Sequence, residues 1–146
     1  MTSSARAMSR RVNRNPRGLP MDTKMRAGDG LYALTLAFLF SHEVDAAYRH
    51  EWRVLPLTSF LPDDVGRELF IWLHVPLFAA ILIYGSRRPV RVWLAAFAVG
   101  HVLLHWMFRN HPAYEFNNPS SWLLILGAGL FGALYLAADP PWRKAG

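Results

Sequence analysis

The stretch from residue 121 to residue 138 reads SWLLILGAGLFGALYLAA, which is eighteen residues without a charged side chain. A helix of this composition is apolar on every face, whereas a helix exposed to water has a polar face. Its length is close to the roughly 20 residues that cross the hydrocarbon core of a bilayer. Asn118 and Pro119 precede it, and this pair is typical of the start of a helix. The stretch therefore predicts a membrane-spanning helix.

Three more stretches of the 146-residue chain have the same character, and 53% of all residues are hydrophobic. We expect one all-α domain over residues 31–138, an integral membrane four-helix bundle. Asp29 and Asp64 are expected to cap the first and second helices, and Pro76 lies inside the second. The spans are predicted at about residues 31–49, 69–84, 90–108 and 121–138.

The distribution of Arg and Lys predicts the orientation of these spans. Seven of the sixteen basic residues lie before position 30, in a tail over residues 1–30 that we expect to be disordered. Basic residues also crowd the second connection and the short tail over residues 139–146, namely Arg87, Arg88, Arg91, Arg143 and Lys144. Basic flanks stay on the cytoplasmic side, so both termini are predicted to be cytoplasmic. The net charge of +6 is explained by this pattern without nucleic acid as a partner.

The tryptophans agree with this topology because their amphipathic rings prefer the two membrane interfaces. None of them falls in the middle of a predicted span. Those expected at the cytoplasmic side are Trp93 and Trp142, and those expected at the outer side are Trp52, Trp72, Trp106 and Trp122.

Small residues recur along the last span at four-residue spacing, which lets another helix approach closely. They are Gly127, Ala128, Gly129, Gly132 and Ala133. The neighbouring helix can belong to the same chain or to a second copy, so a homo-oligomer through this helix is one expectation.

Ionisable residues inside the first span indicate function. Its purely apolar run covers only 31–40, so the span must include His42, Glu43 and Asp45. Such groups are costly in a membrane unless they face the bundle interior or a watery cavity. His50 and Glu51 follow at the outer end of the span.

Histidines of three spans are predicted to share one layer. Counted from the cytoplasmic helix ends, His42, His74, His101 and His105 lie about 14 to 21 Å deep. His101 and His105 are four residues apart and so share a helix face. Together with Glu43 as an oxygen ligand or a base, these imidazoles suit a divalent transition metal such as Zn or Fe. Asp45 is a second catalytic candidate, because it can orient the His42 imidazole.

The motif from His42 through Glu43 to Asp45, with His50-Glu51-Trp52 after it, resembles that of small uncharacterised bacterial four-span membrane proteins. It loosely resembles the HXXEE family, whose motif is His-x-x-Glu-Glu, with Ala46 in place of the second acid. The resemblance implies a four-helix fold in the bacterial inner membrane and metal binding.

Four functions fit these residues. The first is a metal-dependent membrane enzyme whose lipid-like substrate enters between the helices. The second is a bis-histidine haem protein using His42 with His101 or His105. The third is a metal-free proton relay or isomerase, and the fourth is a structural partner within the bilayer. No cysteine is present, so thiolate chemistry is excluded.

Overall fold

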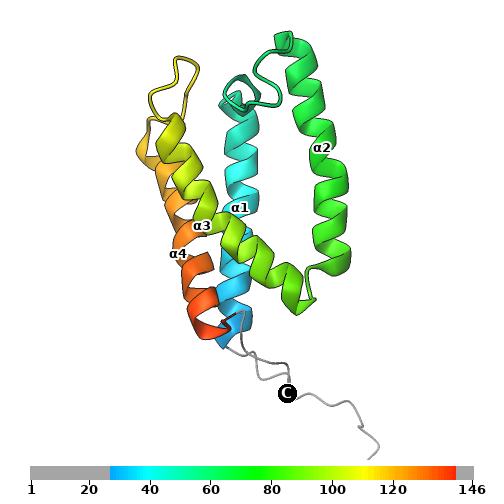
Figure 1. Ribbon diagram of the computed structural model, residues 1–146, viewed down its shortest axis with the longest axis vertical. Helices are drawn as coiled ribbons and strands as arrows, with labels where there is room; N and C mark the ends of the chain where they lie inside the picture. The colour runs from blue at the N-terminus through cyan, green and yellow to red at the C-terminus, as the bar shows by residue number, and fades with distance from the viewer. Residues whose placement is uncertain (1–26, 141–146) are drawn as a thin grey trace, which may run out of the picture.

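The computed structural model describes residues 27–140, which contain four α-helices and no β-strand. They are α1 (Ala27–Tyr48), α2 (Asp63–Tyr84), α3 (Arg88–Phe108) and α4 (Pro119–Ala138), with a short 3-10 helix η1 (Glu51–Arg53) after α1. The chain runs up and down between two ends of the molecule (Figure 1). The all-α prediction is confirmed. Most of the predicted basic tail, together with Trp142, Arg143 and Lys144, lies outside the described residues.

The helix ends agree only partly with the predicted caps. The Asn118 side chain accepts a hydrogen bond from the Ser121 backbone N–H at 2.9 Å, as expected for the start of α4. The other two predictions are wrong, because α1 and α2 begin upstream of the residues expected to cap them. Asp29 lies inside the first turn of α1, and Asp64 is the second residue of α2.

Three helices are long and apolar enough to cross a membrane, namely α2, α3 and α4. Their outward faces carry large apolar side chains such as Leu82 and Trp72, which are 81% and 66% exposed. In a bilayer these side chains would contact acyl chains rather than water. The described residues therefore have the character of a membrane protein.

Helix α4 packs against α1 and α3, and its glycines make this approach possible. Gly132 lies so close to α3 that an added Cβ would be 2.7 Å from the carbonyl oxygen of Ala95. Gly127 and Gly129 face side chains of α1 and α3 in the same way. The small-residue face of α4 is therefore used within the chain, and a homo-oligomer through it stays a prediction.

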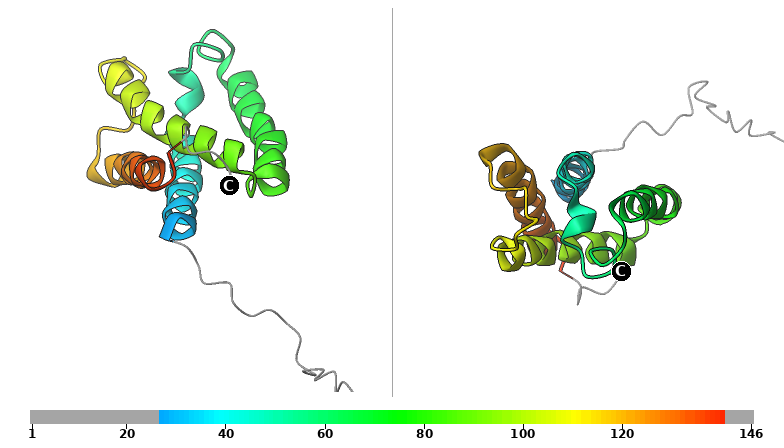
Figure 2. Two further views of the ribbon diagram at one scale, coloured as in Figure 1. Left: turned by 60° about the horizontal axis from the view of Figure 1, so that its bottom comes forward. Right: turned by 90° about the horizontal axis from the view of Figure 1, so that it is seen from above.

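Helix α2 stands apart from this three-helix unit. Seen from above, α2 and α4 lie on opposite sides of α1 (Figure 2). α2 is joined to the rest by η1 and by a few contacts with α1. One is the packing of Phe40 against Phe78, with ring centroids 5.0 Å apart. This arrangement leaves space between α2 and the pair α1 and α3.

Candidate metal centre

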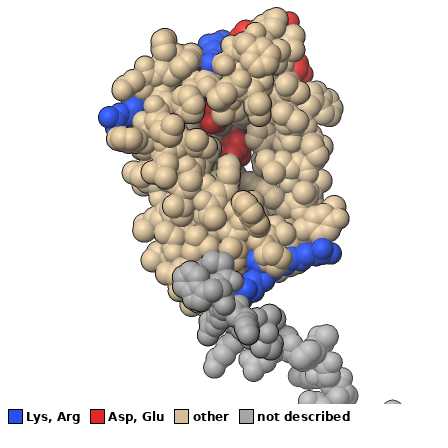
Figure 3. All heavy atoms as spheres, in the orientation of Figure 1, with Lys and Arg blue, Asp and Glu red and all other residues tan. Residues whose placement is uncertain are grey.

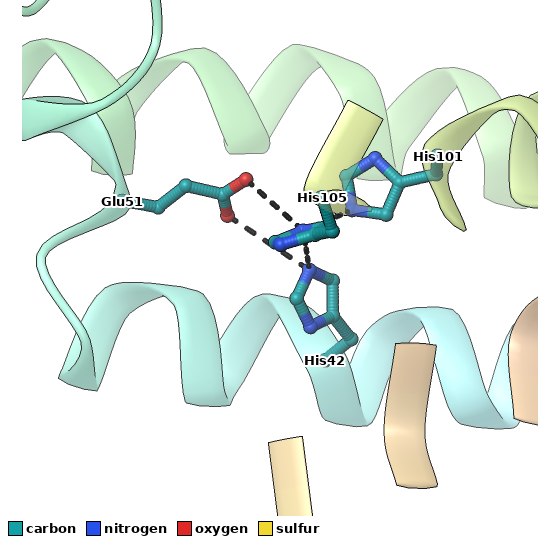
Figure 4. Close-up of side chains that lie close together, drawn as sticks. All are labelled: His42, Glu51, His101 and His105. Carbon is teal, nitrogen blue, oxygen red and sulfur yellow. Dashed lines mark hydrogen bonds and ion pairs between the residues drawn. The ribbon is translucent and has the colours of Figure 1, made fainter. Parts of the chain in front are cut away.

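Four ligating side chains converge in the interior, from α1, η1 and α3. They are His42, Glu51, His101 and His105, which we call the His/Glu cluster (Figure 4). One ligand atom of each lies within 4.8 Å of the others, and all four residues are buried. His42 is fully buried, and the other three are at most 8% exposed.

The spacing of these atoms fits a single ion. The Nε2 atom of His105 is 3.1 Å from Nε2 of His42 and 3.1 Å from Nε2 of His101. The Glu51 carboxylate oxygens are 3.6 Å from Nε2 of His105 and 3.9 Å from Nε2 of His42. A tetrahedral ion with ligands at about 2.0–2.1 Å holds its ligand atoms roughly 3.4 Å apart. The four ligand atoms lie within 4.8 Å of one another, so a cation at the centre would require the outermost side chains to move inward by about 1 Å.

The hydrogen bonding of the rings also favours a cation. Three Nε2 atoms face one another, and a neutral imidazole has one donor and one acceptor. Without an ion, the single Nε2 site of His105 has to serve both contacts, either by accepting from both rings with one lone pair or by sharing its one hydrogen between them. The Nδ1 atoms of His42 and His101 are buried without a hydrogen-bond partner among the described residues. A metal would use all three Nε2 lone pairs at once, and the Nδ1–H groups of His42 and His101 would then have no protein acceptor in the part of the chain that the structure describes.

The third imidazole has a partner on its far side. His105 Nδ1 lies 3.2 Å from the hydroxyl of Tyr114, in the connection between α3 and α4. Burial, with a contribution from Glu51, raises the pKa of Tyr114 to about 12, so this hydroxyl keeps its proton at neutral pH. The contact orients His105 in the way that partners outside a metal's ligand shell usually do.

Glu51 reaches the cluster through an unusual turn. His50 adopts φ 56° and ψ 43°, a left-handed conformation that is uncommon for residues other than glycine. At this turn the chain leaves the direction of α1, and the Glu51 side chain points back to the imidazoles. Burial raises the pKa of Glu51 to about 8, and the nearby Glu43 and Asp45 carboxylates add to the effect.

An ionic network holds this turn in place. Arg53 donates two hydrogen bonds to Asp63, at 2.6 Å from Nε and 2.9 Å from Nη2, and lies 3.4 Å from Glu115. Trp52 donates to the same Asp63 at 2.9 Å, and His50 lies 2.9 Å from Glu115. The segment that carries Glu51 is therefore fixed to the start of α2 and to the connection before α4.

The sequence-predicted site residues fall into two groups. His42, His101 and His105 meet as expected, and Glu51 completes the cluster although it was not predicted as a ligand. Glu43 and His74 instead pair with each other, with Glu43 Oε2 2.8 Å from His74 Nε2. The other His74 nitrogen, Nδ1, lies 2.6 Å from the Phe70 carbonyl oxygen, so the ring is held by two partners outside the cluster.

Asp45 points to another helix. Its carboxylate accepts a hydrogen bond from the Ser121 hydroxyl of α4 and lies 3.4 Å from Arg49. The expectation that Asp45 orients His42 is wrong, because the Nδ1 atom of that ring has no partner among the described residues. Asp45 is thus placed to join α1 to α4.

The geometry also argues against the haem alternative. The His42 and His105 rings are 4.8 Å apart between centroids and 83° apart in orientation, with a third imidazole beside them. Axial haem ligands must face each other across the porphyrin plane. These rings leave no room for that plane between them.

A cavity gives access to the cluster. We call it the site cavity; it has a volume of about 420 Å³ and lies between α2 and α3. Glu51, His101 and His105 line it, while His42 lies behind them. Acidic atoms are visible inside a hollow in the otherwise uncharged middle of this face (Figure 3). Water or a substrate could therefore approach an ion in the cluster from one side.

These observations define an all-α protein of membrane type with a buried His/Glu group that could hold a metal ion. The chain belongs to the family of unknown function DUF6713, whose model matches residues 29–140 and so covers all four helices. No curated protein and no solved structure matches the chain. The predicted resemblance to an uncharacterised family is confirmed at this level, and the likeness to the HXXEE family stays a prediction.

Proposed function

We propose that this protein is an integral membrane metalloprotein whose His/Glu cluster binds one divalent transition metal, Zn or Fe. The observation that carries the proposal is the convergence of three imidazole nitrogens and one carboxylate within 4.8 Å in a buried site. Imidazole and carboxylate are the ligands that these metals take in proteins. Burial raises the pKa of Glu51 to about 8, and an ion in the cluster would stabilise the charged carboxylate as its ligand.

The open side of the cluster supports an enzyme rather than a structural ion site. A catalytic metal needs a coordination position for water or substrate, whereas a structural site is closed by its ligands. Here the four side chains would fill a tetrahedral shell, so water or substrate would take a fifth position on the side where the site cavity touches three of the ligands. The metal would polarise an oxygen of a lipid-like substrate that enters from the bilayer.

We infer further that α1 is the fourth span and that both termini are cytoplasmic, in a bacterial inner membrane. α1 has 22 residues and runs beside the apolar α3 and α4. Its acidic side chains Glu43 and Asp45 have partners on α2 and α4, which lowers the cost of placing them in a bilayer. Because the chain has no cysteine, single cysteines at Ser59 and Ser86 provide a labelling test. Ser59→Cys should react with an impermeant reagent added outside intact cells, and Ser86→Cys should not; the reverse pattern would refute the orientation.

Metal content of the full chain purified in mild detergent tests the metal centre. We expect about one Zn or Fe per chain in the wild type and almost none in the double variant His101→Ala/His105→Ala. The matched control is His111→Ala, because His111 is an exposed histidine outside the cluster. Equal metal content in the wild type and the double variant would refute the proposal.

A further inference from the structure

A second cavity that is almost wholly apolar adjoins the site cavity. This apolar cavity has a volume of about 500 Å³ and lies between α1, α2 and α3. Glu43, Leu77 and Phe97 line both cavities, so the two meet beside the pair formed by Glu43 and His74. The far end of the apolar cavity lies near Val90 and Trp93, at the start of α3.

The combined length of the two cavities suits a single hydrocarbon chain. Val90 lines its far end and His101 lines the site cavity, and these residues are eleven positions apart on α3. At about 1.5 Å per residue this separation is roughly 16 Å. One leaflet of a bilayer has a hydrocarbon thickness of about 15 Å. A chain of the length found in membrane lipids therefore fits between the two points.

The charges around the two cavities select the polar group of such a molecule. No Lys or Arg lines either cavity, as far as the described residues go, and the acidic side chains there are Glu43 and Glu51. With the charge of a divalent ion offset by these two acids, a phosphate or carboxylate head would have no cationic side chain to neutralise it. An uncharged oxygen-bearing group, such as an alcohol, aldehyde or ester, avoids this cost and can still reach a metal.

An opening toward the surroundings of the helices lies next to these cavities, across the contact between Glu43 and His74. A third cavity of about 360 Å³ lies between α1 and α2 and has Glu43 and His74 on its wall. Its rim includes Val44 and Val75, which are 73% and 56% exposed. In a bilayer this rim would face acyl chains, so an amphiphile can enter without passing through water.

We propose that the two joined cavities bind an uncharged single-chain amphiphile, with its hydrocarbon chain in the apolar cavity and its oxygen against the His/Glu cluster. This inference rests on the proposed metal centre and names the substrate class for it. Glu43 and His74 stand where chain and oxygen meet, so they contact the first carbons beside the polar group. Chain length and head-group charge then determine which lipids are accepted.

A photoactivatable 1-dodecanol carrying a diazirine near its chain end provides the test, with the full chain in mild detergent loaded with Co²⁺. We expect labelling of residues that line the apolar cavity, and competition by 1-dodecanol but only weakly by dodecyl phosphate or 1-butanol. Saturation with 1-dodecanol should change the visible absorption of bound Co²⁺, because its oxygen joins the ligand shell.

Two matched variants on α2 make the test specific. Leu77 lines both cavities, so Leu77→Trp should weaken labelling about tenfold by filling the space. Leu82 is 81% exposed and lines neither cavity, so Leu82→Trp should stay within about twofold of the wild type. Equal labelling of the two variants, or equal competition by dodecyl phosphate, would overturn the inference.

The failures of the two proposals are distinguishable. A wild-type protein that takes up neither Co²⁺ nor Zn²⁺ refutes the metal centre, and labelling of the metal-free protein then decides by itself whether the amphiphile occupies the cavity. Uptake of Co²⁺ with labelling confined to outward residues such as Leu82 leaves the metal centre standing and refutes the amphiphile. Labelling in the cavity without a change in the Co²⁺ spectrum refutes the contact between oxygen and metal.

Discussion

Replacing Glu51 by Gln should change the stability of the protein little without a metal and lower it clearly with one. Glu51 is 6% exposed, and its oxygens lie 3.6 and 3.9 Å from imidazole nitrogens. Burial raises its pKa to about 8, so at pH 7 without an ion the acid is mostly uncharged. Gln has the same shape and is also uncharged. Without metal, the free energy of unfolding of the variant should therefore lie within about 1 kcal/mol of the wild-type value.

With a metal bound, the carboxylate would be a ligand, and its loss should weaken metal binding strongly. Mutating residues around a metal's ligands already costs about 10- to 100-fold in affinity, so we expect at least about 100-fold here. At a Zn²⁺ concentration 100 times the wild-type Kd, binding stabilises the wild type by about 2.7 kcal/mol. A variant with a 100-fold higher Kd gains only about 0.4 kcal/mol. The expected difference is about 2.3 kcal/mol.

Thermal unfolding in mild detergent, followed with Zn²⁺ and with a chelator, measures both effects. The matched control is Glu68→Gln, because Glu68 is an exposed acid near the start of α2 that pairs with the neighbouring Arg67 and lies outside the cluster. The control should keep the full Zn²⁺ response. If Glu51→Gln gains as much stability from Zn²⁺ as the wild type does, Glu51 is not a ligand and the reasoning is refuted.

Three other changes test the surroundings of the cluster. Gly132→Ala should destabilise the fold by about 1–3 kcal/mol, because its Cβ would meet the Ala95 carbonyl at 2.7 Å. Gly100→Ala is the control, because a Cβ there has open space and should not destabilise the fold. Unfolding midpoints in detergent compare the two variants. His74→Gln should leave one metal per chain, since His74 pairs with a carboxylate outside the cluster, and a loss of metal would contradict this. Arg53→Met should raise the metal Kd about 10-fold in a Zn²⁺ titration by freeing η1, while an unchanged Kd would show that this anchor does not position the ligand.

The helices and three of the four cluster residues could be predicted because they follow from regular helix geometry. Hydrophobic length predicted the helices, and depth counted along them placed His42, His101 and His105 at one level. The same count put His74 in that layer. Depth alone, however, does not give the lateral distance between helices. Because α2 stands away from α3, the imidazole of His74 contacts Glu43 instead of the cluster.

Glu51 could not be predicted in this way, because its position depends on a turn rather than on a helix. Nine residues further along a continuous helix, Glu51 would lie about 13 Å beyond His42. The left-handed His50 breaks that helix and brings the carboxylate to 3.9 Å from the imidazole. No glycine marks the turn, so propensity gives no warning of it. The acidic residue directly before Trp52 is the only local signal in the sequence.

The two parts of the fold have different roles at the proposed centre. α1, α3 and α4 pack closely through the α4 glycines, and this unit fixes the three imidazoles at their mutual distances. α2 is held mainly by η1, by the bond between Glu43 and His74, and by Asp63 with Arg53. A movement of α2 that widens the cavities would leave the imidazoles in place but pull on the segment that carries Glu51. In the proposed centre, entry of an amphiphile and coordination by Glu51 would therefore be mechanically linked.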